Sequence, residues 1–172
     1  FCGIAVAQPP TGYYNSAAGL TGEALQAALN DIIDNHTVIP YSGLWNAFRD
    51  TDKRSDGKVW DMYSSCDFTF GTNQCGNYSS ECDCYNREHS WPKSFGFADE
   101  GDYNYPYSDC HQLFLCNDSY NTSRNNRPYN NVGGSGTTER TTVANNGVGG
   151  GSGTYPGWSN WYNTTYWETW WD

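Results

Sequence analysis

Three short segments in the second half of the chain hold the residues whose types could perform chemistry. The first places Glu88 directly before His89, the second contains His111, and the third contains Asn121 and Arg124. Each segment is a weak signal alone, because an isolated histidine is more often structural than catalytic. Asn121 and Arg124 stand three residues apart, so a helix over 117–125 would project both from one face. A metal ligand and a phosphate clamp could then converge there.

The order and separation of these segments resemble the ββα-metal core of the bacterial endonuclease I family. The resemblance is carried by N-R-E-H-x-W-P-K-S at 86–94, S-D-x-H-x-L-F at 108–114 and N-x-x-R-x-N at 121–126. Similar motifs at 13–14, 19–22, 36–37, 41–42 and 59–64 extend it over most of residues 10–135. It implies an α+β fold with a ββα-metal (His-Me finger) site, loop-rich and disulfide-containing, and the activity of a secreted, sequence-non-specific endonuclease.

The resemblance also assigns roles that suit the residue types. His89 titrates near neutrality and can act as general base if its other ring nitrogen is held by an acceptor, in this family a backbone carbonyl. Glu88 and Asn121 offer oxygen ligands to Mg²⁺, or to another divalent cation such as Ca²⁺ or Mn²⁺. Because one base suffices and its neighbours look buried, His111 is expected to be structural.

Arginine supplies the expected phosphate contacts. Arg124 fits a phosphate clamp through its bidentate fork, and Arg87 and Arg127 are weaker candidates. The net charge of −10 opposes approach to a polyanion, so the hypothesis requires a local positive cleft on an acidic body. DNA and RNA both fit as partners through their backbone phosphates, because no residue is evident that tests the 2′-hydroxyl.

The cysteine content predicts an oxidising compartment. The chain has seven cysteines, an odd number, and six are disulfide candidates: Cys66, Cys75, Cys82, Cys84, Cys110 and Cys116. The spacing of Cys110 and Cys116 allows a local bridge. Zinc is the competing interpretation for Cys75, Cys82 and Cys84, but paired C-x2-C motifs are absent. Glycosylation sequons that suit a secreted or periplasmic glycoprotein begin at Asn35, Asn77, Asn117, Asn121 and Asn163.

We expect one domain over 1–172, with a core at 10–131 that contains the active-site segment 85–127. Thr21 can cap a helix, which is predicted by the apolar spacing of Leu25, Ala28, Leu29, Ile32 and Ile33. A second helix is expected near Ser42, a strand over 58–63 and a cross-linked loop over 64–84. No apolar run is long enough to span a bilayer, and the start at Phe1 carries no signal peptide, so an export signal would already have been removed.

The carboxyl-terminal end departs from the family. Residues 132–153 are rich in Gly, Ser, Thr and Asn and predict a flexible or edge-strand segment, while the closing helix of the family is absent from the aromatic tail at 154–172. Five tail residues need cover: Trp158, Trp161, Trp167, Trp170 and Trp171. They would fold over the first helix or, as we favour, contact a second copy.

The second outcome supports an alternative function, an extracellular structural or filament-forming glycoprotein that uses a nuclease-like domain with little or no activity. The tryptophan and tyrosine content also leaves a carbohydrate-binding protein open.

Overall fold

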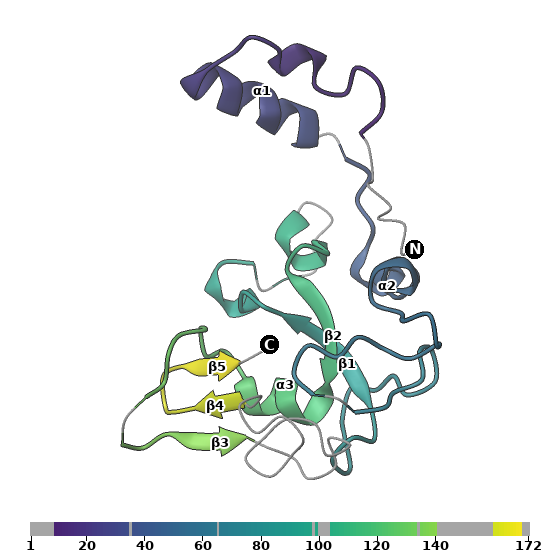
Figure 1. The fold of residues 1–172 in the computed structure, drawn as a ribbon, viewed down its shortest axis with the longest axis vertical. Helices are drawn as coiled ribbons and strands as arrows, with labels where there is room; N and C mark the ends of the chain where they lie inside the picture. Colours follow the sequence, from purple (N-terminus) through teal and green to yellow (C-terminus); the bar gives the residue numbers. More distant parts are fainter. Residues whose placement is uncertain are drawn as a thin grey trace, which may run out of the picture. The chain divides into compact units, whose positions relative to one another are not determined.

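The computed structural model describes residues 9–34, 36–64, 66–97, 99, 104–133, 135–140 and 160–169. The chain divides into two compact units, Phe1–Val38 and Ile39–Asp172 (Figure 1). No helix within the described residues is long and apolar enough to cross a membrane. The catalytic candidates all belong to the second unit.

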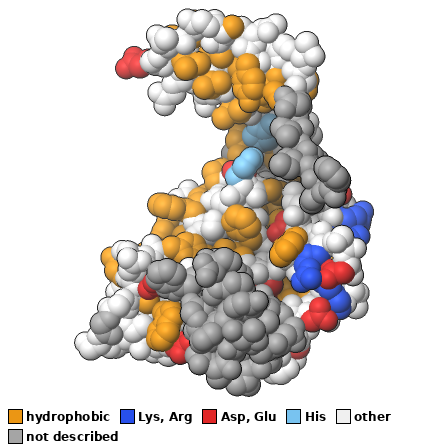
Figure 2. Space-filling model, in the orientation of Figure 1, with side chains coloured by type: hydrophobic (Ala, Val, Ile, Leu, Met, Phe, Trp, Pro, Cys, Tyr) orange, Lys and Arg blue, Asp and Glu red, His pale blue; other side chains and the backbone are white. Residues whose placement is uncertain are grey.

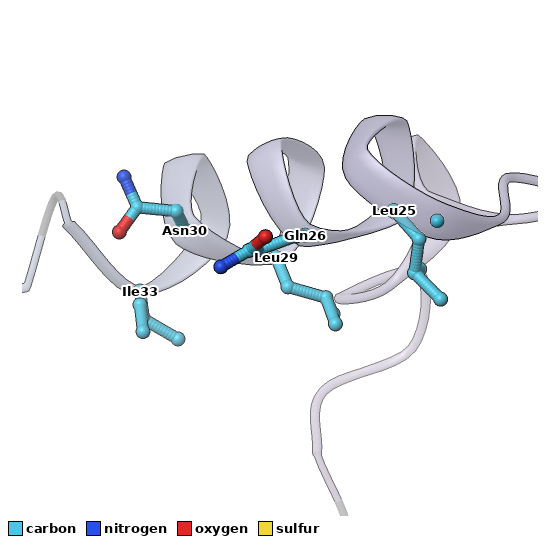
Figure 3. Close-up of a pocket in the computed structure, with 6 residues that line it drawn as sticks. Leu25, Gln26, Leu29, Asn30 and Ile33 are labelled. Atoms are coloured by element: carbon cyan, nitrogen blue, oxygen red, sulfur yellow. The ribbon is translucent and has the colours of Figure 1, made fainter.

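The first unit contains the predicted amino-terminal helix. A 3-10 turn at Asn15–Ala17 precedes α1, which runs over Gly22–Asp34. Leu25, Leu29 and Ile33 project from one side of α1 and line a pocket with Gln26 and Asn30 (Figure 3). The helix is confirmed, but none of its described residues is buried, so its apolar stripe does not enter a core.

The centre of the second unit is a strand pair followed by a helix. Strand β1, Tyr85–His89, runs antiparallel to β2, Leu113–Asn117, and α3 begins directly after it at Asp118–Arg124. The side chain of Asn117 accepts a hydrogen bond from the Ser119 amide and so caps α3. This β-β-α order confirms the predicted α+β fold and the helix expected over 117–125.

Helix α2 packs on one face of the strand pair. It runs over Leu44–Thr51 after a 3-10 turn at Tyr41–Gly43, which confirms the second predicted helix. Leu44 and Phe48 are fully buried, and they join a cluster that also includes Val59, Cys66, Phe68, Tyr85, Leu113 and Leu115. The inward-facing residues of β2 therefore rest on a helix that the apolar spacing had located.

The predicted strand over 58–63 is wrong. Only isolated bridges form there, pairing Lys53 with Val59 and Lys58 with Thr69. The Val59 amide bonds to the Phe68 carbonyl and the next amide, of Trp60, bonds to Asp52. Because successive amides bond to different segments, no continuous ladder can develop.

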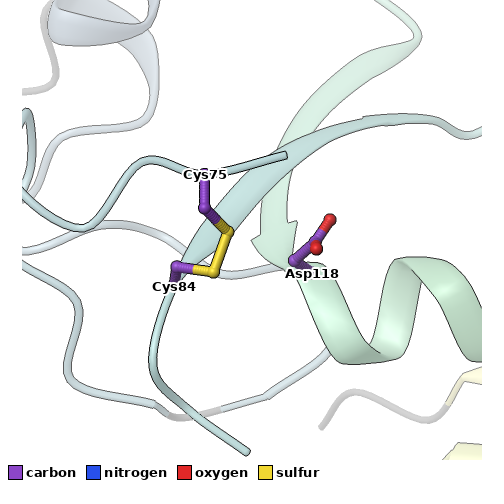
Figure 4. Close-up of side chains that lie close together, drawn as sticks. All are labelled: Cys75, Cys84 and Asp118. Atoms are coloured by element: carbon purple, nitrogen blue, oxygen red, sulfur yellow. A yellow bond between two sulfur atoms is a disulfide. The ribbon is translucent and has the colours of Figure 1, made fainter. Parts of the chain in front are cut away.

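The loop at 64–84 is cross-linked as predicted, by Cys66–Cys82 and Cys75–Cys84. Asp118 lies beside the second disulfide at the start of α3, and the three ligand atoms are within 4.8 Å of one another (Figure 4). Sulfurs joined in a disulfide offer no thiolate to a metal, so the zinc interpretation fails for this group.

Cys110 and Cys116, two of the six disulfide candidates, do not form the local bridge that their spacing allowed, and both thiols are free. Cys110 packs against the α2 cluster, whereas Cys116 is buried in a second cluster with Tyr63, Tyr120 and Trp167. The two side chains therefore belong to different clusters despite their short sequence separation. Cys2 lies outside the described residues.

The carboxyl-terminal segment forms a small antiparallel sheet in the order β3-β4-β5. Its strands are Thr138–Arg140, Asn160–Tyr162 and Trp167–Thr169. Thus the part of the Gly-rich segment that the structure describes includes an edge strand, β3, as the composition indicated. Residues 141–153, which complete that segment, are outside the described ranges.

Trp167 corrects the expectation for the tail. Its side chain is 0% exposed and packs in the second unit with Tyr63, Cys116 and Tyr120, while Tyr162 stacks on it. The Trp167 amide also bonds to the Pro128 carbonyl. Trp167 therefore belongs to the core of the second unit. Its position supports neither of the expected arrangements of the tail, packing over α1 or contact with a second copy. Trp158, Trp170 and Trp171 are outside the described residues.

Trp167→Ala should lower the free energy of unfolding by about 3–5 kcal/mol, because it removes the largest fully buried side chain and leaves a cavity. Trp60→Ala is the matched control, since Trp60 is 63% exposed, and it should change stability by about 0.5 kcal/mol or less. Urea denaturation measures both. Equal effects of the two substitutions would contradict the buried position of Trp167.

Candidate active site

Glu88 is a buried carboxylate held from two directions. It is 3% exposed, and its Oε1 accepts hydrogen bonds from the Tyr63 hydroxyl at 2.6 Å and from Arg124 Nη1 at 2.8 Å. Burial raises the pKa of Glu88 to about 7, against the lowering effects of Arg124 and Tyr63. No described residue donates to the other oxygen, Oε2, so this oxygen remains available as a ligand.

Arg124 connects the end of α3 to the end of β1. Its side chain is 1% exposed, and its donors reach the Glu88 carboxylate and three backbone carbonyls, those of His89, Ser90 and Arg127. The sequence predicted a phosphate clamp at this position. In the structure a substrate phosphate would have to compete with all these acceptors, so the geometry is that of a residue that positions Glu88.

His89 has its two ring nitrogens in different roles. Nε2 lies 2.8 Å from the Tyr107 carbonyl, which can only accept, so Nε2 carries the proton and Nδ1 keeps its lone pair. The ring is 7% exposed and lies nearly parallel to Tyr41, with Phe97 and Tyr107 on other sides. Here the backbone acceptor that a histidine base requires is present.

The surroundings keep His89 uncharged at neutral pH. Burial lowers the pKa of His89 below its ordinary value, and the positive charges of Lys93, Arg87 and Arg124 lower it further, while the bond to Tyr107 opposes them. The imidazole is therefore neutral near pH 7 and can accept a proton.

Asn121 presents an amide oxygen close to the same strand. Its Nδ2 donates to the Arg87 carbonyl at 3.1 Å, which fixes the orientation of the amide and leaves Oδ1 for a ligand. The anchoring carbonyl belongs to the residue before Glu88. A carboxylate oxygen and an amide oxygen are donors of the kind that Mg²⁺ takes from a protein, alongside water and phosphate oxygens.

Both weaker phosphate candidates take part in packing. The Arg87 guanidinium lies 3.7 Å above the Tyr41 ring and donates to the Tyr41 carbonyl. Arg127 donates to the carbonyls of Ser123, Arg124 and Asn163. The structure thus unites Glu88, Arg124 and the Asn121 anchor around β1, while Arg127 lies with the carboxyl-terminal sheet.

The tyrosines at the site were missed by the sequence reasoning. Tyr63 binds Glu88, its hydroxyl also contacts that of Tyr129, and Tyr107 holds His89. Tyr63 lay within the upstream motif at 59–64, which was a usable signal. Nothing in the sequence indicated Tyr107, because it holds His89 through its backbone carbonyl, a group that every residue has.

Comparison with known proteins agrees with this geometry. The family model for endonuclease I matches residues 21–164. The chain belongs to the endonuclease I family. As a member of this family, it is similar to the "Extracellular ribonuclease" of Bacillus subtilis (strain 168), with 36% identity over 123 residues, covering 70% of the chain and 40% of that protein.

The protein of the same name from Bacillus amyloliquefaciens is 35% identical over a stretch of the same length and coverage. The chain therefore spans about 40% of the length of the two curated relatives. No solved structure is significantly similar to the chain.

Arg124→Ala should lower the free energy of unfolding by about 3–5 kcal/mol, because the buried Glu88 carboxylate loses its cationic partner and three carbonyls lose the bonds from Arg124. Arg54→Ala, which breaks the exposed ion pair with Asp56, is the matched control and should cost about 1 kcal/mol or less. Chemical denaturation at pH 8, where Glu88 is ionised, distinguishes the two. A loss of stability in Arg124→Ala no larger than in the control would contradict the interior role.

Proposed function

We propose that the chain is a divalent-metal-dependent endonuclease in which His89 is the general base. The observation that carries the proposal is the bond from His89 Nε2 to the Tyr107 carbonyl, together with the lowered pKa of His89. These leave Nδ1 as an unprotonated acceptor at neutral pH. Membership in the endonuclease I family supports a phosphodiester as the bond that is hydrolysed.

The side chains divide the work of hydrolysis. His89 Nδ1 accepts the proton of the attacking water. Glu88 Oε2 and Asn121 Oδ1 are the proposed ligands of Mg²⁺ or another divalent cation, which when bound would neutralise charge on the phosphate and the leaving oxygen. Tyr63 and Arg124 hold the other carboxylate oxygen, so they orient Glu88 without occupying Oε2. Arg124 is then a positioning residue.

RNA is the first substrate to test, because both curated relatives are named extracellular ribonucleases. Recognition of the backbone phosphate would allow DNA as well and little dependence on the bases flanking the cut. The same names, with the two disulfides, support secretion. The structural alternative loses its main support, because Trp167 is buried within its own unit.

His89→Ala should reduce kcat by about 10²–10⁴-fold through loss of the base. His111→Ala is the matched control, since the His111 side chain is 98% exposed, and it should leave kcat unchanged. Added imidazole should restore part of the activity of His89→Ala, which a purely structural histidine would not explain. Nicking of plasmid DNA and cleavage of labelled RNA, with and without chelator, supply the rates.

Metal affinity should rise with pH. Because a cation binds the carboxylate and the pKa of Glu88 is about 7, Mg²⁺ affinity should increase about tenfold per pH unit below 7 and level off near 8. Titration calorimetry in His89→Ala measures this without turnover. Glu88→Gln should abolish the slope, whereas Asn121→Ala should weaken binding and keep it. A slope unchanged in Glu88→Gln would exclude Glu88 as the titrating ligand.

The same shift acts on the free protein with the opposite sign. The pKa of Glu88 is about 7 in the folded state, against an ordinary value of 4.5 in the unfolded chain. The contribution of Glu88 to the free energy of unfolding is therefore complete below about pH 4.5 and is lost as the pH rises through 7. Saturating Mg²⁺ should therefore stabilise the protein more at pH 8 than at pH 6. Thermal melting at both pH values checks this expectation.

A further inference from the structure

A cavity lies against β2, one of the two strands around which the proposed active site is built. It has a volume of about 210 Å³ and is lined by Asp52, Trp60, Asp61, Met62 and Phe114. Phe114 pairs with Glu88 across the strands, so both side chains lie on the same face of the sheet, about 5 Å apart at Cβ. One wall residue of the cavity is therefore a neighbour of Glu88, on the face of the strand pair opposite the His89 side chain.

Two segments outside β2 form the rest of its wall. The Met62 amide donates to the Leu115 carbonyl, and the Leu115 amide donates to Asp52 Oδ1. Asp61 accepts bonds from the Tyr63 and Asn117 amides. These bonds fix the cavity to the same strand pair that carries the catalytic candidates.

Trp60 is the exposed part of this wall. Its side chain is 63% exposed, although its backbone amide is bonded to the Asp52 carbonyl. A large apolar ring that remains in solvent beside a cavity is the arrangement of a stacking platform for a planar ligand. The Arg54 guanidinium lies over one face of the ring, 5.3 Å from its centroid, so a base would stack on the other face.

The chemistry of the wall selects a nucleobase over a phosphate. Trp60, Met62 and Phe114 offer apolar surface, and the two carboxyl groups, Asp52 and Asp61, repel a phosphate when ionised. Asp61 already accepts bonds from Tyr63, Asn117 and Ser64. Each oxygen of Asp52 accepts a single bond, from Leu115 or Thr51, so Asp52 keeps a lone pair for an N–H donor. A base combines flat apolar faces with such donors. Adenine, cytosine and guanine carry an exocyclic amino group, and uracil does not. The volume is below that of pockets for larger ligands, which suits a single base.

Cations close by can meet the flanking phosphates. Four of the nine Lys and Arg residues fall within 49–58: Arg49, Lys53, Arg54 and Lys58. Lys and Arg side chains gather where Figure 1 draws α2 and the loop after it (Figure 2). Arg54 and Lys58 pair with Asp56 and Asp67, whereas Arg49 and Lys53 form no ion pair within the described part of the chain.

We propose that Trp60 and this cavity form a subsite for an unpaired nucleobase with an exocyclic amino group. The base belongs to the strand whose phosphate is hydrolysed beside Glu88 and His89, so the inference rests on the proposed function. Because bases in a duplex are stacked and paired, the subsite gives preference to single strands. It also gives adenine or cytosine an advantage over uracil next to the cut.

Binding to labelled single-stranded eight-nucleotide oligo(A), oligo(C) and oligo(U), and to duplex RNA, tests the subsite by fluorescence anisotropy in chelator. The full chain should bind oligo(A) and oligo(C) more tightly than oligo(U) or duplex. Trp60→Ala should weaken binding of oligo(A) by about 5- to 100-fold, the loss expected for one stacked base, and Trp60→Phe should restore most of it. Trp91→Ala removes another exposed tryptophan, 59% exposed, and should have a smaller effect.

Asp52→Asn tests base selection separately. An amide can donate as well as accept, so this variant should narrow the difference between oligo(A) and oligo(U) while Trp60 still stacks. Circular dichroism shows whether each variant is folded. If Asp52→Asn does not fold, Trp60→Ala still tests the subsite, because Trp60 is exposed. Unchanged oligo(A) binding in Trp60→Ala, or an equal loss in Trp91→Ala, would overturn the subsite.

Failure of the subsite is distinguishable from failure of the proposed function. Binding in chelator requires no turnover, so selective binding through Trp60 without any hydrolysis would support the subsite and reject the nuclease. Normal hydrolysis of single-stranded RNA with the same KM in Trp60→Ala would leave the nuclease and reject the subsite. If the nuclease function and the subsite are both correct, Trp60→Ala should raise KM for single-stranded RNA and leave kcat within about twofold.

Discussion

The buried ion pair between Glu88 and Arg124 is the interaction on which the second unit depends. Arg124 is the last residue of α3, Glu88 lies near the end of β1, and Tyr63 reaches the same carboxylate oxygen from the segment before the disulfide loop. A buried pair of this kind contributes little net stability compared with apolar packing, but it becomes costly when one partner is lost. The ion pair instead fixes the positions of three segments that are distant in sequence, because all three must meet at one carboxylate.

Strand alternation explains how adjacent residues serve different parts of the site. Glu88 and His89 point to opposite faces of β1, so the carboxylate meets Arg124 and Tyr63 while the imidazole meets Tyr41, Phe97 and Tyr107. Burial acts on both, and it favours the uncharged form of each. In the proposed mechanism the neutral form of His89 is the base, and Glu88 would regain its charge on binding a cation. A metal-dependent enzyme can use both shifts.

The sequence predicted the helices and the strand-helix core because those elements depend on local spacing and on contiguous motifs. The sequence did not predict which groups Arg87, Arg124 and Arg127 bind, since their partners are mostly backbone carbonyls that any segment could supply. The strand expected at 58–63 failed for a related reason, because successive amides there bond to different segments. The pairing of Cys66 with Cys82 and Cys75 with Cys84 depended on the path of a loop without periodicity, so only the set of candidate cysteines could be named.

The interior use of arginine bears on how an acidic chain can bind a polyanion. With net charge −10 and only nine cationic residues, a chain whose Arg87, Arg124 and Arg127 bond to carbonyls, carboxylate and rings has few charges left for phosphate. Counterion release at the remaining cations would be small, so electrostatics alone gives weak binding. The proposed metal site and the proposed base subsite would both add affinity without a positive surface. Stacking on Trp60, an exposed ring in the wall of a cavity, is the contribution that the second proposal assigns to this chain.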